Sequence, residues 1–195
     1  LSTASFDARR GKTAVEKNDL ISISVAIHKL PEEFTSHKRI KKIYNDRSVS
    51  VLNGVGIDWA TAEALAFASL LSEGFGVRLS GQDVGRGTFS QRHAVLYDQV
   101  NEKRFVPLRH FQDQQGLFEI VDSFLSEYGV LGFEYGYSQV DPKTLVLWEG
   151  QFGDFVNNAQ TIIDQFITTG ERKWLRMSGL TLLSVSYTHL RAHET

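Results

Sequence analysis

The sequence predicts an α/β protein with a doubly wound, mainly parallel sheet. Short runs of β-branched and apolar residues recur along the chain, bounded by turn residues: "VRLSGQDV", "FEIVD", "TLVLW" and "LTLL". Helical patterns lie between these runs, and an alternation of strands and helices is typical of parallel sheets. The runs are apolar on both faces, so we expect helices to cover the sheet on both sides.

The first 50 residues do not show the alternation of strand and helix patterns that the rest of the chain shows. A polar start and the alternating stretch "LISISVAI" precede "LPEEFTSHKRIKKIYNDR". The last segment predicts a basic amphipathic helix with Ile40, Ile43 and Tyr44 on one side. We expect residues 1–50 to form an arm or linker that leads into a domain at residues 51–183.

Two further helices are predicted within that domain. The segment "DWATAEALAFASLLSEG" has Asp58 as an N-cap, strong helix formers, and Gly74 as its stop. In "QFGDFVNNAQTIIDQFITTG", apolar residues recur at i, i+3, i+4 and i+7 from Phe152 to Ile167. This spacing predicts one long amphipathic helix that ends at Gly170.

The composition excludes several classes of protein. A formal net charge of −2 gives no electrostatic reason to expect a nucleic acid or an anionic membrane as partner. The chain contains no cysteine, which rules out disulfides, thiolate nucleophiles and cysteine-ligated zinc. It has no apolar run of the roughly 18 residues that a membrane span requires.

The loop "SGQDVGRGTFSQRH" follows a predicted strand and ends at His93. Open α/β sheets bind ligands at the carboxyl ends of their strands, where glycines let the backbone approach a ligand. The loop matches neither GxxxxGK[ST] nor GxGxxG, the patterns of common nucleotide sites. On pattern alone, a ligand loop with a functional His93 and a polar loop with a surface histidine are both open interpretations.

Carboxyl and amide side chains also stand at two other strand-to-helix junctions. Glu127 follows Ser126, a predicted N-cap, and "LWEGQFGDF" carries Glu149, Gln151, Phe152 and Asp154. These positions suit ligand binding at the carboxyl edge of a sheet. Acidic residues are equally favoured there by the helix dipole, without any function.

The chain ends in "SVSYTHLRAHET". His189 and His193 have the i, i+4 spacing of a zinc pair, but no third ligand lies at a suitable spacing, and no metal site is predicted. The segment resembles translated sequencing-adapter sequence. We expect residues 184–195 to be non-native and the chain to be a truncated fragment.

Four long strings carry a family resemblance: "GIDWATAEALAFASLLSEGFGVRLSGQDVGRGTFSQRHAVLYDQ", "LSEYGVLGFEYGYS", "LVLWEGQFGDFVNNAQTIIDQFI" and "ERKWLRMSGL". They closely resemble the thiamine-diphosphate-dependent decarboxylating component of the 2-oxoglutarate dehydrogenase complex. The resemblance runs from about Arg9 to Leu183 and covers the central transketolase-like domain, which receives the pyrimidine ring of the cofactor.

The resemblance implies a role for each candidate residue. Glu127 would hydrogen-bond the pyrimidine N1′ and promote the imino form that activates the cofactor. Phe152 would stack on the pyrimidine, and Gln151 would contact its polar edge. His93 would be an acid/base group or a donor to the 2-oxo acid. The Mg²⁺ that holds the diphosphate would be bound by a GDG…N motif in an earlier domain, which this sequence does not contain.

The resemblance also implies the reaction and the partners. The parent enzyme would decarboxylate 2-oxoglutarate and transfer the succinyl group to a lipoyl arm of the succinyltransferase component, working as a homodimer in the bacterial cytoplasm, or in the mitochondrial matrix if it is eukaryotic. We expect the isolated chain to be inactive. A 2-oxoadipate dehydrogenase and a non-catalytic binding module of the same fold remain as alternatives.

Overall fold

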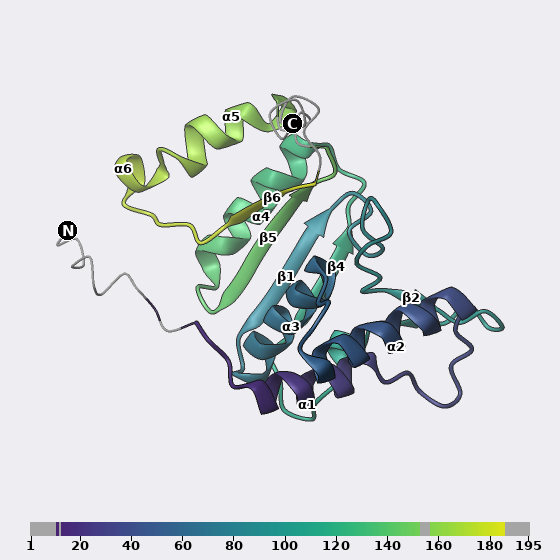
Figure 1. The fold of residues 1–195 in the computed structure, drawn as a ribbon. Helices are drawn as coiled ribbons and strands as arrows, with labels where there is room; N and C mark the ends of the chain where they lie inside the picture. Colours follow the sequence, from purple (N-terminus) through teal and green to yellow (C-terminus); the bar gives the residue numbers. More distant parts are fainter. Residues whose placement is uncertain (1–10, 12, 153–156, 186–195) are drawn as a thin grey trace, which may run out of the picture.

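A four-stranded parallel sheet forms the centre of the computed structural model, which describes residue 11, residues 13–152 and residues 157–185. Its strand order is β4-β1-β5-β6, with β1 at Gly76–Gly81, β4 at Phe118–Asp122, β5 at Thr144–Gly150 and β6 at Thr181–Ser184. Each neighbouring pair is parallel. The predicted strands and the parallel sheet are confirmed (Figure 1).

Helices cover both faces of this sheet, as a doubly wound fold requires. Helix α3 (Trp59–Ser72) packs on one face and α4 (Glu127–Val140) on the other. Successive residues of β5 show the division: Leu147 belongs to the core cluster beside α3, whereas Trp148 belongs to the cluster beside α4. Because side chains alternate along a strand, a strand buried on both faces is mainly apolar.

Helix α3 begins and ends where its sequence predicts. The Asp58 carboxylate accepts a hydrogen bond of 2.7 Å from the backbone N–H of Thr61, which satisfies one free donor of the first turn. Gly74 follows the last turn with φ of +85°, a conformation that glycine adopts without steric cost.

Two helices from the first 53 residues pack onto the α3 side of the domain. Helix α1 spans Lys17–His28, including the alternating stretch, and α2 spans Lys38–Asn53. Ile27 and Val51 are buried in the same core cluster as β1 and β4. The predicted basic amphipathic helix is confirmed from Lys38 onward, with Tyr44 buried, whereas residues 30–37 of the predicted segment are not helical. The division of the chain at residue 50 stays a prediction.

A long connection on the α3 side joins β1 to β4. It contains the two-stranded antiparallel pair β2 (Leu96–Tyr97) and β3 (Arg104–Phe105), followed by the short 3₁₀ helix η2 (Pro107–Arg109). Val84, Val106 and Leu108 from this connection are buried in the core. The connection is therefore packed onto the domain, and the candidate loop that ends at His93 lies within it.

The predicted single helix ending at Gly170 is wrong in part. Residues 153–156 lie outside the described residues, so the first half of the prediction is not covered. After them come α5 (Gln160–Ile162), a π-helical turn η4 (Ile163–Ile167) and α6 (Gly170–Trp174). Gly170 begins α6, and a Cβ at this position would overlap the Tyr135 hydroxyl. A glycine is needed here because of close packing against α4, and not because a helix ends at this position.

Candidate functional site at the carboxyl edge of the sheet

Glu127 lies at the first turn of α4, at the carboxyl edge of the sheet. Ser126 caps this helix, as predicted, by accepting a hydrogen bond of 3.4 Å from the backbone N–H of Gly129. The Glu127 carboxylate is half-buried and accepts one hydrogen bond of 3.3 Å from the Gln82 amide and another of 3.3 Å from the Asn158 amide. Gln82 directly follows β1, so the carboxylate sits beside the end of the central strand.

Gln151 and Phe152 directly follow β5, next to the same edge. Gly81 at the end of β1 pairs with Asp122 of β4 on one side and with Glu149 of β5 on the other, so the three strand ends are aligned. The Phe152 side chain is 37% exposed. Asp154 lies outside the described residues, as do His189 and His193.

Glu149 is paired within the fold. Its side chain is 3% exposed and forms an ion pair with Arg92, which also binds Glu63 at 2.6 Å. A buried carboxylate with a bidentate guanidinium partner has its charge and hydrogen bonds satisfied within the fold. Through Arg92, Glu149 therefore connects β5 with α3 and with the loop before His93.

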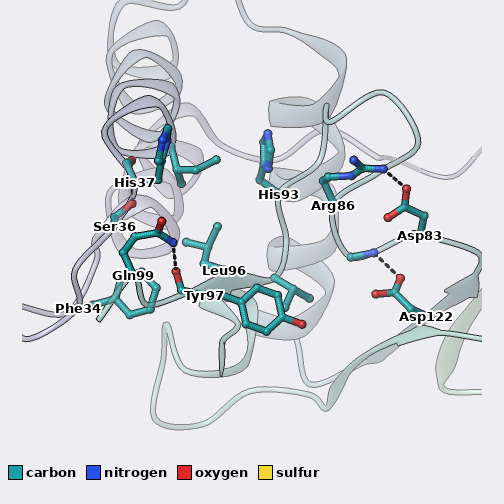
Figure 2. Close-up of a pocket in the computed structure, with 13 residues that line it drawn as sticks. Phe34, Ser36, His37, Asp83, Arg86, His93, Leu96, Tyr97, Gln99 and Asp122 are labelled. Carbon is teal, nitrogen blue, oxygen red and sulfur yellow. Dashed lines mark hydrogen bonds and ion pairs between the residues drawn. The ribbon is translucent and has the colours of Figure 1, made fainter. Parts of the chain in front are cut away.

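His93 lines a cavity of about 420 Å³ on the α2 side of the same edge (Figure 2). The cavity lies between α2 and the loop after β1, and His37, at the start of α2, stands across it from His93. Asp83 and Arg86, which form an ion pair, and Asp122, which accepts a hydrogen bond of 2.9 Å from the backbone N–H of Gly85, also line it.

The electrostatic surroundings of His93 favour a neutral imidazole. Desolvation by burial lowers the pKa of His93 below its ordinary value of 6.5, and the positive charge of Arg47 lowers the pKa further. A neutral imidazole can donate one hydrogen bond and accept another, and it can take up a proton. It is therefore suited to acid/base work at neutral pH more than to holding an anion by charge.

The structure brings the candidate residues to one edge but not around one cavity. Gln82 binds Glu127, and the next residue, Asp83, lines the cavity that contains His93. The residues that line this cavity do not include Glu127, Gln151 or Phe152. In this chain the site thus has two parts, one on each side of the loop that follows β1.

Sequence reasoning missed the contacts that hold the loop around His93. Tyr44 and Arg47 of α2 bond to the backbone of the loop around His93, and Arg92 is buried between two carboxylates. The amphipathic pattern of α2 placed Tyr44 on a packed side, but no signal in the sequence predicted its partner. Asp122 could have been found as the last residue of a predicted strand, at the edge where ligands bind.

The residues around Glu127 fit a planar nitrogen heterocycle. Among the described residues, each carboxylate oxygen accepts one long hydrogen bond, from an amide on a flexible side chain, so either oxygen can turn to a ring nitrogen. Phe152 offers an aromatic ring and Gln151 an amide on the same edge. Within the described part of the chain, no group of three or more His, Asp or Glu side chains could hold a metal ion.

In the described ranges no helix is long and apolar enough to cross a membrane.

Comparisons with known proteins agree with this architecture. The family described as "Transketolase, pyrimidine binding domain" matches residues 55–192. Proteins named "2-oxoglutarate dehydrogenase E1 component" from Brucella canis, Brucella suis and Brucella abortus are each 56% identical to this chain over 177 residues. The matched region is 91% of this chain and 18% of each relative, so the chain spans less than a fifth of the length of these curated relatives.

Proposed function

Because the chain belongs to the transketolase pyrimidine-binding domain family, we propose that it is the pyrimidine-binding part of a thiamine-diphosphate-dependent 2-oxoglutarate dehydrogenase E1 component. The parent enzyme decarboxylates 2-oxoglutarate and passes the succinyl group to the lipoyl arm of its partner succinyltransferase. The names of the relatives favour 2-oxoglutarate over 2-oxoadipate and over a non-catalytic module.

The observation that carries this proposal is the position of Glu127. Its carboxylate lies at the carboxyl edge of a parallel sheet, held by amides from two neighbouring segments. Thiamine diphosphate, when bound, supplies the nucleophilic carbon and the electron sink that decarboxylation of a 2-oxo acid requires. Glu127 would hold a proton between its carboxyl group and the pyrimidine N1′, and Gln82 and Asn158 would orient that carboxyl group.

The other candidate residues have distinct roles in this proposal. The Phe152 ring would support one face of the pyrimidine, and the Gln151 amide would meet its polar edge. His93 moves a proton to or from the 2-oxo acid, a role for which a neutral imidazole is suited. Mg²⁺ and the diphosphate would be held by an earlier domain of the parent enzyme. The active enzyme is a homodimer, and in bacteria it works in the cytoplasm.

The test uses the longest natural reading frame that contains residues 9–183. Turnover of 2-oxoglutarate is measured with and without thiamine diphosphate and Mg²⁺, for the wild type, Glu127→Gln and a matched control, Glu73→Gln, at the exposed end of α3. We expect cofactor-dependent turnover that falls at least 100-fold in Glu127→Gln, which is the lower range of a general acid/base contribution. Glu73→Gln should keep wild-type turnover.

Three outcomes would contradict the proposal or part of it. Absence of turnover from a folded, cofactor-loaded protein would reject the enzymatic function and favour a binding module. Faster turnover of 2-oxoadipate than of 2-oxoglutarate would replace the substrate. Full activity of Glu127→Gln would leave the family assignment in place but remove Glu127 from the proposed site.

A further inference from the structure

Helix α2 holds three consecutive backbone carbonyls of the loop that carries His93. The Tyr44 hydroxyl donates a hydrogen bond of 2.7 Å to the carbonyl of His93 itself. The Arg47 guanidinium donates to the carbonyls of the two preceding residues, at 3.0 Å to Arg92 and by a second short bond to Gln91. Tyr44 and Arg47 are three residues apart and so lie on one face of α2.

We propose that Tyr44 and Arg47 are positioning residues, which fix the backbone on which His93 presents its imidazole to the cavity. This inference rests on the proposed role of His93 in the reaction. It gives a function to α2, a helix from the first 53 residues, whose own side chains are otherwise explained by packing.

The same short segment is held from its other side. The backbone N–H groups of Arg92 and His93 both donate to the Arg86 carbonyl, each at 3.0 Å. The Arg92 side chain donates to the Val84 carbonyl at 3.0 Å and pairs with Glu63 and Glu149. Both backbone groups of His93 are therefore bonded, and the residue before it is anchored in the core.

The backbone of His93 needs such support because it is strained. Its φ is +51°, in the left-handed region that residues with a Cβ rarely adopt. A conformation of this kind persists only where the surrounding structure determines it. Relaxation to an ordinary negative φ would turn the imidazole away from its present place in the cavity, opposite His37 (Figure 2).

The surroundings of Tyr44 keep its ring fixed and its hydroxyl protonated. Its side chain is buried, and the ring packs edge-on against His28 with 5.4 Å between the ring centroids. Burial also raises the pKa of the Tyr44 phenol, so the hydroxyl stays a donor across the physiological range. Tyr44→Phe keeps the ring and its packing and removes only the bond to the His93 carbonyl.

The test measures hydrogen exchange and turnover in the full-length natural protein. Tyr137→Phe is the matched control, because the Tyr137 hydroxyl of α4 donates a similar bond of 3.0 Å to Glu119, away from His93. We expect amide exchange across residues 91–94 to rise in Tyr44→Phe and to stay at the wild-type rate in Tyr137→Phe. Turnover should fall about fivefold in Tyr44→Phe, which corresponds to one net hydrogen bond.

A double-mutant cycle with His93→Ala separates positioning from general stabilisation. If Tyr44 acts through His93, Tyr44→Phe has no further effect on turnover once the imidazole is gone. Arg47→Lys keeps the positive charge near His93 but loses the planar fork that spans two carbonyls. Turnover in Arg47→Lys should therefore also fall, and the fall should again vanish in the His93→Ala background.

Four outcomes would overturn the proposal or its premise. Unchanged exchange across residues 91–94 in Tyr44→Phe would show that the bond does not hold the loop. A fall in turnover that persists in full in the His93→Ala background would make the contact structural only. A wild type without cofactor-dependent turnover, or a fully active His93→Ala, would reject the proposed function or the role of His93, and the positioning role with it.

Discussion

His28 makes the fold sensitive to mild acid. It is the last residue of α1, and its Nδ1 lies 2.9 Å from the Ser24 carbonyl, where a neutral imidazole donates a hydrogen bond. Burial is the main cause that lowers the pKa of His28 from 6.5 to about 4, and the nearby Arg47 charge acts in the same direction. The hydrogen bond to Ser24 and the charge of Asp58 oppose this shift.

The direction and size of this pH dependence follow from the difference between the pKa of His28 in the folded chain and in the unfolded chain. In the unfolded chain His28 takes up its proton near pH 6.5, whereas in the folded chain it does so only near pH 4. Its contribution to stability is therefore complete above pH 6.5 and is lost as the pH falls towards 4. At about 1.4 kcal/mol for each unit of pKa difference, the loss between pH 7 and pH 5 is about 2 kcal/mol.

His28→Asn tests this reasoning, because an asparagine amide can donate near the Nδ1 position and does not ionise. The assay is urea unfolding followed by circular dichroism at pH 7 and pH 5, with His110→Asn, at an exposed histidine, as the control. The wild type and His110→Asn should lose about 2 kcal/mol more than His28→Asn on acidification. An equal loss of stability on acidification in all three proteins would show that protonation of His28 is not its cause.

Three other substitutions should change the free energy of unfolding, measured by the same urea method. Glu134→Gln breaks the buried, bidentate pair with Arg78, whose two bonds measure 2.8 and 2.9 Å, and should cost about 3 kcal/mol; a loss below about 1 kcal/mol would contradict this. Gly116→Ala places a Cβ against the backbone carbonyl of Phe75, which cannot rotate away, and should cost more than about 2 kcal/mol. Gly136→Ala lies within α4 with open space around the added Cβ, and should stabilise by about 0.5–1 kcal/mol; destabilisation there would show that the space is not open.

The strands and caps were predictable because their signals are local. The run "FEIVD" predicts a buried strand, and β4 occupies the same residues, Phe118–Asp122. Asp58 and Ser126 each cap a helix as predicted, since a cap depends only on a side chain and the first turn that follows it. The helix after β5 was not predictable in the same way: its π-helical turn and the close approach of Gly170 to Tyr135 depend on packing against α4.

By itself, the sequence determined the α/β class, the parallel sheet, the family, and the candidate residues in the segments that follow the strands: Glu127, Gln151, Phe152 and His93. Only the tertiary structure decided that Glu149 is paired within the core while Glu127 stands at the open edge, although both are acidic residues at strand-to-helix junctions. It also decided that α2 holds the His93 loop, through a bond between residues 49 positions apart. Such contacts depend on how separate elements meet in space, and neither periodicity nor composition records that arrangement.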